Sequence, residues 1–155
     1  IGLVRGKKDR EIAVEAAEQW LIDALHECAS FNKNVQFAIE PINRYETDLI
    51  NTVQSGLALL EKVDRKNVGL LLDTFHMNIE EPSITESIRA AKDCLFHFHV
   101  ADSNRWYPGA GHVDFRSVFD TLKEIGYSGF VSAEILPLPD SDLAAKNAIE
   151  YLRTL

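Results

Sequence analysis

The sequence is poor in three features, and each absence narrows the class of protein. It has two cysteines, Cys28 and Cys94, among 155 residues, so at most one disulfide can form. Two free thiols in a reducing, cytoplasmic environment are the simpler expectation. No apolar run approaches the roughly 20 residues of a membrane span, and the N-terminus lacks the basic, apolar and small-residue regions of a signal peptide. We therefore expect no membrane partner.

The sequence also lacks an excess of positive charge. Its 24 acidic residues outnumber its 16 Lys and Arg residues, which gives a formal net charge of −8. Proteins that bind a phosphate backbone need a basic face, so we expect no nucleic-acid partner. The apolar share of 46% and the charged share of 26% are typical of globular proteins. A chain of this length can bury the core of one domain.

Strand-like and helix-like segments alternate along the chain. Apolar or alternating runs predict strands, and apolar residues spaced three and four apart predict the helices between them. The expected strands are 1–6, 35–39, 68–72, 94–100 and 129–135. The expected helices are 9–31, one that carries Val53 to Val63, 84–91, 115–125 and 141–155. We expect Trp20 on the buried stripe of the first helix, Asp48 as the N-terminal cap of the second, and Gly126 as the C-terminal cap of the fourth. About 30 residues per strand–helix unit is typical of βαβ units in a parallel sheet.

Two α/β architectures fit this alternation. A flavodoxin-like doubly wound sheet would be complete at this length. A (β/α)8 TIM barrel needs about 250 residues, so the chain would supply its last five βα units and lack the first three. Strand patterning favours the barrel, because one face is strongly apolar, as in Phe96, Phe98 and Val100, whereas the other carries small and polar residues, as in Ala38 and Glu40. We therefore expect residues 1–155 to form one partial TIM-barrel domain, the C-terminal part of the barrel.

Four of the expected strands end in a side chain that can bind a metal: Glu40, Asp73, His99 and Glu134. Parallel α/β folds place their chemistry at the carboxyl ends of the strands. One acidic residue at a strand end is more often a helix cap or a solvated loop residue. Four such residues, each separated from the next by close to one βα unit, predict a ring of ligands at one depth around a single ion. Three carboxylates and an imidazole suit divalent Mn, Mg or Co better than a structural zinc.

Four segments of the chain together resemble the ketose 3-epimerases of the xylose isomerase-like TIM-barrel superfamily, such as D-tagatose and D-psicose 3-epimerases. These segments are Glu40-Pro-Ile-Asn-Arg-Tyr-Glu46, Asp73-Thr-Phe-His76-Met-Asn-Ile-Glu80-Glu81, His97-Phe-His99-Val-Ala-Asp-Ser-Asn-Arg105 and Pro108-Gly-Ala-Gly-His112-Val-Asp-Phe115. The resemblance implies that Glu40, Asp73, His99 and Glu134 bind the metal and that Glu40 and Glu134 are also the catalytic acid/base pair. It further implies that Glu46, His76 and Arg105 hold substrate oxygens near C1 and C2, and that the protein is a homo-oligomer.

The activity that this resemblance implies is metal-dependent epimerisation of a ketose or a ketose phosphate at C3. One carboxylate removes the proton next to the carbonyl, a divalent metal (Mn first, Co or Mg as alternatives) stabilises the enediolate, and a proton returns from the other face. Four further residues have weaker signals. Arg5 could reach a substrate phosphate, Phe75 and Trp106 could line the sugar site, and His112 could border the pocket, although each has an equally simple structural explanation.

Other functions of the same superfamily remain alternatives. A hydroxypyruvate isomerase or an inosose dehydratase-like enzyme would use a related barrel. An abasic-site nuclease of the endonuclease IV type needs three zinc ions, more histidine ligands and a DNA-binding groove, and the acidic charge counts against it. From a different class, the chain could be a truncated, non-catalytic fragment that binds metal or sugar without turnover.

Overall fold

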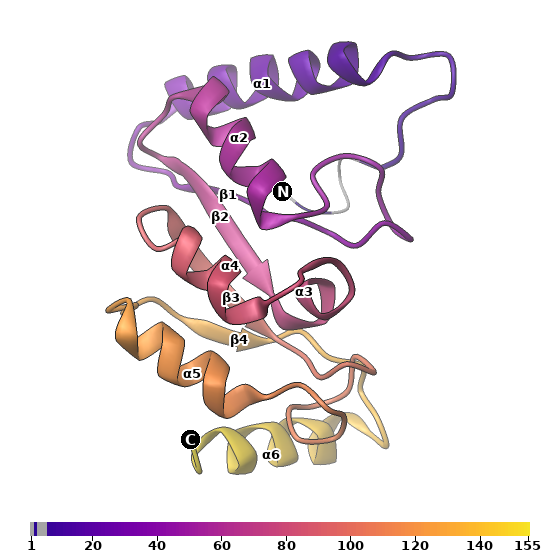
Figure 1. The fold of residues 1–155 in the computed structure, drawn as a ribbon, viewed down its shortest axis with the longest axis vertical. Helices are drawn as coiled ribbons and strands as arrows, with labels where there is room; N and C mark the ends of the chain where they lie inside the picture. Colours follow the sequence, from indigo (N-terminus) through magenta and orange to yellow (C-terminus); the bar gives the residue numbers. More distant parts are fainter. Residues whose placement is uncertain (1, 3–5) are drawn as a thin grey trace.

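The computed structural model describes residue 2 and residues 6–155. Arg5 and most of the strand expected over residues 1–6 therefore lie outside the described residues. The strands found in the described part are β1 (Phe37–Ile39), β2 (Val68–Asp73), β3 (Leu95–Val100) and β4 (Val131–Ala133). The helices are α1 (Val14–Phe31), α2 (Val53–Val63), α3 (Thr74–Glu80), α4 (Ile84–Ala90), α5 (Phe115–Glu124) and α6 (Ser141–Leu152) (Figure 1).

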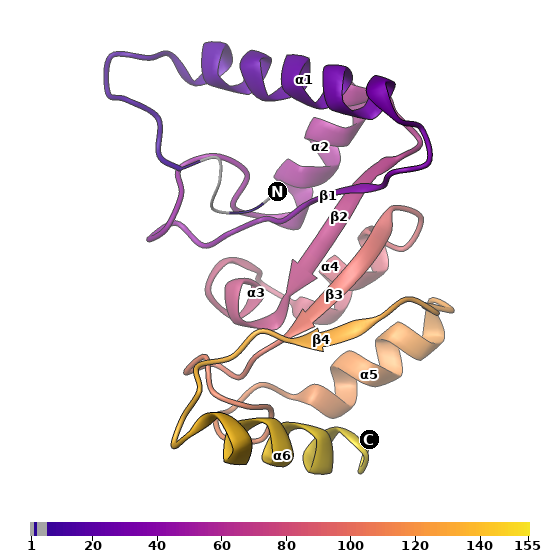
Figure 2. The same cartoon turned by 180° about the vertical axis from the view of Figure 1, so that it is seen from behind.

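The strands form one parallel sheet in the order β1-β2-β3-β4, which is also their order in the chain. Figures 1 and 2 show α2, α4 and α5 against one face of this sheet, with α1 and α6 at its two ends. No helix among the described residues covers the opposite face. Sequential parallel strands with helices on one side are the arrangement of a TIM-barrel wall, and they confirm this fold class over a doubly wound sheet.

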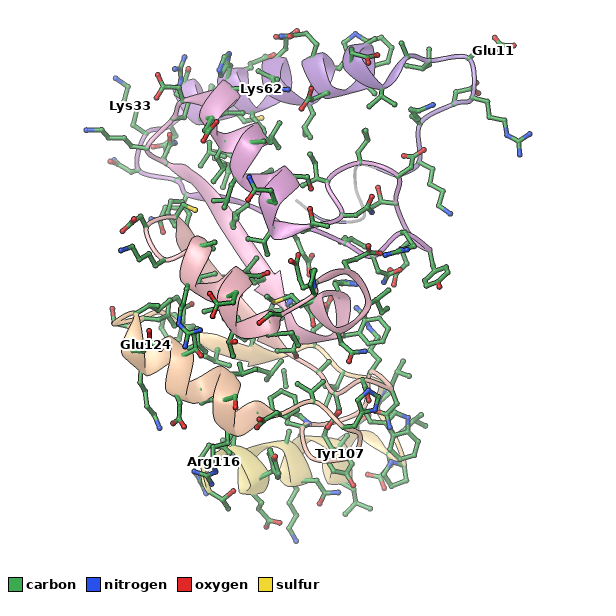
Figure 3. All side chains as sticks on the ribbon, in the orientation of Figure 1. Glu11, Lys33, Lys62, Tyr107, Arg116 and Glu124 are labelled. Atoms are coloured by element: carbon green, nitrogen blue, oxygen red, sulfur yellow. The ribbon has the colours of Figure 1, made fainter. Side chains whose placement is uncertain are left out.

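The hydrophobic core lies between the sheet and the helices. Its fully buried strand residues alternate along β1, β2 and β3 and include Ile39, Leu70, Leu72, Phe98 and Val100, each at most 1% exposed. Burying one such side chain stabilises a fold by about 1.5–3 kcal/mol, so this face holds the helices in place. Ion pairs add cross-links between neighbouring helices. Lys62 pairs with Glu18 of α1, and Glu124 pairs with Arg89 of α4 (Figure 3).

The face assignment expected for Phe96 was wrong. Leu70 of β2 pairs with Leu95, and Leu71 pairs with His97, so the register shifts and Phe96 is an extra residue in β3. Leu95 consequently takes the helix-facing position and is 8% exposed. The Phe96 ring instead packs over Gly69, where an added Cβ would lie 2.8 Å from the ring. A bulge reverses the alternation locally, and the strand pattern alone does not reveal it.

Two other local expectations were wrong, and one was confirmed. Trp20 is 60% exposed, because α1 buries Ala17, Ile22, Leu25 and Ala29 instead. α2 is capped by Thr52, which shares a capping box with Ser55, and not by Asp48. Asp48 instead accepts the backbone N–H of Lys8 at 3.1 Å. Gly126 follows α5 with a φ of +70°, the left-handed conformation expected after a helix end.

Helix α3 was not expected from the sequence. Asp73 caps it by accepting the backbone N–H of Phe75, so the helix begins directly at the end of β2. The helix follows β2 without a connecting loop, so no turn separates the two elements in the sequence. Among the helices that the structure describes, none combines the length and apolar character that a bilayer-crossing helix needs.

Candidate metal and sugar site

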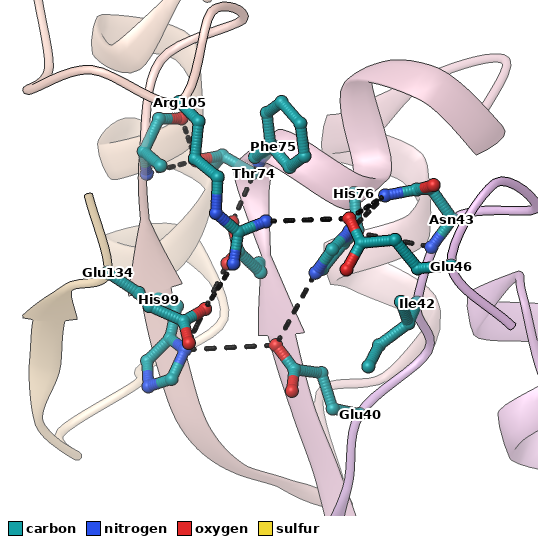
Figure 4. A network of polar contacts seen from close by, with 12 residues as sticks. Glu40, Ile42, Asn43, Glu46, Thr74, Phe75, His76, His99, Arg105 and Glu134 are labelled. Carbon is teal, nitrogen blue, oxygen red and sulfur yellow. Dashed lines mark hydrogen bonds and ion pairs between the residues drawn. The ribbon is translucent and has the colours of Figure 1, made fainter. Parts of the chain in front are cut away.

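The four side chains expected to bind a metal converge at the carboxyl ends of the strands. Glu40 follows β1, Asp73 ends β2, His99 is the penultimate residue of β3, and Glu134 follows β4. His99 Nδ1 lies 3.8 Å from Glu40 Oε1, 4.0 Å from Asp73 Oδ2 and 3.4 Å from Glu134 Oε2. Figure 4 shows Glu40, His99 and Glu134 pointing toward one another from three different strands. The structure therefore brings all four residues into one cluster.

These residues do not lie at one depth along the sheet. Asp73 and His99 are paired neighbours, and His99 pairs with Ser132, two residues before Glu134. Ile39 pairs with Leu70, so Glu40 lies two residues short of Asp73 along the sheet. A stagger between neighbouring strands is the normal consequence of strand tilt in a barrel. Because each offset is an even number of residues, every side chain stays on the same face.

Asp73 is the most deeply buried member of the cluster. Its side chain is 0% exposed. Oδ1 accepts the Phe75 backbone N–H at 2.8 Å, whereas Oδ2 has no hydrogen-bond partner within the described residues. Burial, together with the nearby Glu134 and Glu40 carboxylates, raises the pKa of Asp73 well above its usual range, although the Phe75 N–H opposes this. Three carboxyl groups therefore surround one point, and the Arg105 guanidinium, 3.1 Å from Glu134 Oε2, supplies a single positive charge beside them.

A divalent cation fits this cluster. The candidate ligand atoms of Glu40, Asp73, His76 and Glu134 all lie within 4.8 Å of one another. Ligands about 2.1 Å from one ion lie up to about 4.2 Å apart, so only small adjustments would be needed. His99 Nδ1, like Asp73 Oδ2, is buried and has no hydrogen-bond partner among residues 2 and 6–155. Carboxylates with imidazole are a donor set suited to Mn, Mg or Co.

A second histidine, His76, borders the same cluster. It lies in the first turn of α3 and is 2% exposed, and its Nε2 is 3.9 Å from Glu40 Oε1. Burial, with a smaller contribution from Arg105, lowers the pKa of His76 from 6.5 to about 4. Burial also lowers the pKa of His99. Both rings are therefore neutral at pH 7, and distance alone does not say which one would bind a cation.

Arg105 and Glu46 form the opposite side of the site, above Phe75. Arg105 Nη2 donates to Glu134 Oε2 at 3.1 Å, and Nη1 lies 3.9 Å from Glu46 Oε1. The guanidinium carbon lies 4.7 Å from the centre of the Phe75 ring (Figure 4). Nη1 is buried without a hydrogen-bond partner in the described part of the chain. This guanidinium is thus held in place with one N–H group available to a bound oxygen.

The buried Asp102 carboxylate holds the loop that carries Arg105 in place. Asp102 is 0% exposed, and its carboxylate accepts the backbone N–H groups of Ser103, Gly109 and Val113 at 2.7–3.1 Å. Burial alone would raise the pKa of Asp102, but these donors lower it. Arg105 itself has a φ of +61°, a conformation that non-glycine residues adopt at a cost. The Asp102 network stabilises that conformation.

Two residues that support the site were not found from the sequence. The Thr74 hydroxyl donates to the Ala101 carbonyl at 2.7 Å and accepts the Ala101 N–H at 2.9 Å, which joins the ends of β2 and β3. The Asn43 amide contacts both His76 Nδ1 and Glu46 Oε1 at 2.8 Å. The only signal in the sequence is that Asn43 and Thr74 lie within the motifs around Glu40 and Asp73. The residue types Asn and Thr do not by themselves indicate a functional role.

The weaker candidates have different surroundings. Phe75 lies under Arg105, as described above. The Trp106 ring contacts Tyr107, and the Trp106 carbonyl accepts the Asp102 N–H at 2.9 Å. His112 is exposed, and its Nδ1 lies 2.9 Å from the Ser103 hydroxyl. Arg5 lies outside the described residues.

Fold and site together define a TIM-barrel segment with a candidate cation site at its strand ends. The chain belongs to the xylose isomerase-like TIM barrel family, whose model matches residues 1–155. It is 47% identical to the L-ribulose 3-epimerase of a Methylomonas species over 124 residues, which are 80% of this chain and 43% of that protein. The expected family and fold class are thereby confirmed.

Solved structures of similar proteins support the same family and fold class. The chain is similar to a D-psicose 3-epimerase from Clostridium cellulolyticum solved with D-tagatose, with a TM-score of 0.88 and 31% identity over 99% of this chain and 62% of that one. It is also similar to a Methylomonas D-allulose 3-epimerase in complex with D-allulose, with a TM-score of 0.87 and 35% identity over 95% of this chain and 58% of that one. The chain thus spans about half the length of the relatives that it matches.

Proposed function

We propose that this chain carries the metal and acid/base site of an enzyme that epimerises a ketose, free or phosphorylated, at C3. The convergence of Glu40 and Glu134 on one cluster, from the first and last strands of the described sheet, carries the proposal. The names of the relatives, L-ribulose, D-psicose and D-allulose 3-epimerases, agree with it. We also propose that the protein assembles as a homo-oligomer.

Epimerisation next to a carbonyl needs two proton-transfer groups. One group removes the proton from one face of the carbon, and the other returns a proton to the opposite face. Glu40 and Glu134 approach from either side of His99, whose Nδ1 lies 3.8 Å and 3.4 Å from their nearest oxygens. Burial alone would raise the pKa of Glu134, but the Asp73 carboxyl, Arg105 and His99 lower it. Glu134 is therefore ionised at neutral pH and able to accept a proton.

Glu40, Asp73, His99 and Glu134 would hold the divalent ion, with Mn proposed first and Co or Mg as alternatives. Such an ion supplies positive charge next to substrate oxygens that become negative when the proton leaves. The polar groups of the chain would orient the same oxygens. Arg105 Nη1 has an N–H group to donate, and Glu46 and His76 lie beside it. Donors already in position stabilise developing charge without reorganising.

The direct test is hydrogen exchange at C3. The protein is incubated with Mn²⁺ and either L-ribulose or D-psicose in D₂O, and deuterium at C3 is followed by NMR. We expect metal-dependent deuterium incorporation together with formation of the C3 epimer. Glu134→Gln should abolish both while largely keeping sugar binding, because the amide is nearly isosteric but cannot carry the proton. Undiminished exchange in this variant would contradict the acid/base role of Glu134.

Binding of metal and sugar without turnover is the second candidate. It is favoured by the openness of the site on the β4 side, where the Glu134 side chain is 47% exposed. Catalytic charges work best when water is excluded. Calorimetry that detects Mn²⁺ and ketose binding, without any exchange at C3, would select this role. Exchange on hydroxypyruvate, dehydration of an inosose, or nicking of abasic DNA would instead select the corresponding superfamily alternative.

A further inference from the structure

Asn43 and His76 make a buried contact that takes no part in the proposed proton transfers. Asn43 lies in the loop after β1 and is 1% exposed, and His76 lies in α3 and is 2% exposed. Asn43 Nδ2 lies 2.8 Å from His76 Nδ1. The Asn43 backbone N–H points at the same ring nitrogen from 3.4 Å (Figure 4). Two groups of one residue therefore meet one nitrogen of the imidazole.

Two other partners set the orientation of the Asn43 amide. Its Nδ2 lies 2.8 Å from Glu46 Oε1, and its Oδ1 accepts the Tyr45 backbone N–H at 3.0 Å. An ionised carboxylate only accepts hydrogen bonds, and a backbone N–H only donates them. Exchanging the amide oxygen and nitrogen would place acceptor against acceptor and donor against donor. Nδ2 is therefore the amide nitrogen, and its second hydrogen is directed at His76.

We infer that Asn43 is a positioning residue that fixes His76 as the neutral tautomer with its proton on Nε2. Because Nδ1 faces two donors, it must present its lone pair, and the single ring proton then belongs to Nε2. Nε2 is the nitrogen that faces the cluster, 3.9 Å from Glu40 Oε1. In this tautomer it donates a hydrogen bond and has no lone pair to offer to a cation.

The two histidines of the cluster consequently have different tasks. His99 Nδ1 has no hydrogen-bond partner within the described residues, so its lone pair can bind the divalent ion. His76 directs an N–H toward the same space and donates to a substrate oxygen. Because Nδ2 also contacts Glu46, Asn43 couples the placement of two groups around the substrate. The task at the substrate rests on the proposed function, whereas the tautomer of His76 does not.

The tautomer can be measured directly. Long-range ¹H–¹⁵N spectra of the metal-free protein, labelled at its histidine rings, distinguish a protonated ring nitrogen from one with a lone pair. The chain has five histidines, and the His76→Gln spectrum identifies the His76 signals by their loss. We expect Nδ1 of His76 to show a lone pair and Nε2 to carry the proton. A proton on Nδ1 in the wild-type protein would overturn the inference without any further variant.

Asn43→Asp tests whether Asn43 is the cause. A carboxylate cannot donate to Nδ1, so the proton should move to Nδ1, and kcat should fall about a hundredfold, the usual effect of losing one preorganised donor. Asn51→Asp is the matched control. Asn51 Nδ2 donates to the Ile42 and Thr47 carbonyls, at 2.6 Å and 3.0 Å, in the same loop. It should weaken the loop but leave the His76 tautomer unchanged. An equal change in both variants would show that the loop, and not the Asn43 amide, sets the tautomer.

A third measurement separates the histidines. Adding diamagnetic Zn²⁺ to the wild-type protein should shift the His99 Nδ1 signal and leave the proton on His76 Nε2. Loss of that proton on metal addition would overturn the division of tasks. If the protein turns over no ketose while His76 keeps its proton on Nε2, then the proposed function fails and the inferred tautomer stands.

Discussion

Asp73→Asn should have opposite effects on the metal-free and the metal-bound protein. In the absence of metal, Asp73 faces Glu40 and Glu134 with ligand atoms within 4.8 Å. At that distance, and with an effective dielectric constant of about 20, two ionised carboxylates repel each other by about 3.5 kcal/mol. An asparagine keeps the hydrogen bond from the Phe75 N–H and can donate to a neighbouring carboxylate. We therefore expect the metal-free variant to be more stable by about 1–3 kcal/mol, the range for removing an unsatisfied buried group.

The pH dependence of this difference follows from the raised pKa of Asp73. A carboxyl group whose pKa is raised in the folded state makes its complete contribution to the unfolding free energy below its unfolded pKa of about 3.9. That contribution is lost as the pH rises through the folded pKa. The advantage of Asp73→Asn should therefore be largest at neutral pH and should shrink as the pH falls toward about 4.

With metal bound, the carboxylate becomes favourable and its removal costs affinity. Losing groups that merely support metal ligands commonly weakens binding 10–100-fold. We therefore expect Asp73→Asn to raise the Kd for Mn²⁺ at least about 100-fold, which corresponds to about 2.7 kcal/mol. The stabilisation gained on adding saturating Mn²⁺ should fall by the same amount.

Urea unfolding at pH 7 with a chelator or with Mn²⁺, combined with calorimetry for the Kd, measures both quantities. Equal Mn²⁺ affinities in the two proteins would refute the metal assignment. A metal-free variant that is clearly less stable than the wild type would refute the electrostatic account of the cluster.

Three further changes test other parts of the site. Asp102→Asn should destabilise the metal-free protein by about 1–3 kcal/mol in urea unfolding, because the amide would put a donor where a carboxylate oxygen now accepts backbone N–H groups. A gain in stability would contradict the role of Asp102 in the loop. Arg105→Lys keeps the positive charge but loses the planar contact with Phe75 and the reach to both Glu134 and Glu46. We therefore expect kcat/KM for a ketose to fall about 10–100-fold, while the unfolding free energy changes by less than about 1 kcal/mol. An unchanged kcat/KM would exclude Arg105 from substrate binding. The pKa of His76 is about 4 in the folded protein and about 6.5 in the unfolded chain. Its contribution to the unfolding free energy is therefore complete above pH 6.5, and at most about 3 kcal/mol is lost as the pH falls toward 4. In His76→Gln, the unfolding free energy should depend less on pH over this window.

Sequence patterns were sufficient for the alternation of strands and helices and, to within two residues, for the ends of the described strands. The apolar run before Asp73 and the alternation around His99 depend only on neighbouring residues, because a strand buries every second side chain. The same local logic located Glu40 and Glu134, each directly after a strand. These four positions are therefore identifiable as one cluster from the sequence.

Local patterns failed where the backbone departs from regular geometry. The extra residue at Phe96 leaves the apolar character of the strand unchanged, and α3 follows β2 without a connecting loop that would mark its start. The loop that carries Arg105 has no repeating pattern, and its buried Asp102 carboxylate accepts N–H groups from residues up to 11 positions away. In the loop that carries Arg105, the hydrogen bonds join residues whose distance in the chain follows no fixed period.

The sequence alone determined which residue types stand at the ends of the strands, and with them the family and the class of chemistry. Tertiary structure alone decided which side chain sets the position of the ring proton on His76. Asn43 and His76 are 33 residues apart, and only folding brings a donor of one to a ring nitrogen of the other. The sequence does not show which ring nitrogen of His76 carries the proton, because that position depends on the partner of the other nitrogen, and that partner exists only in the folded chain.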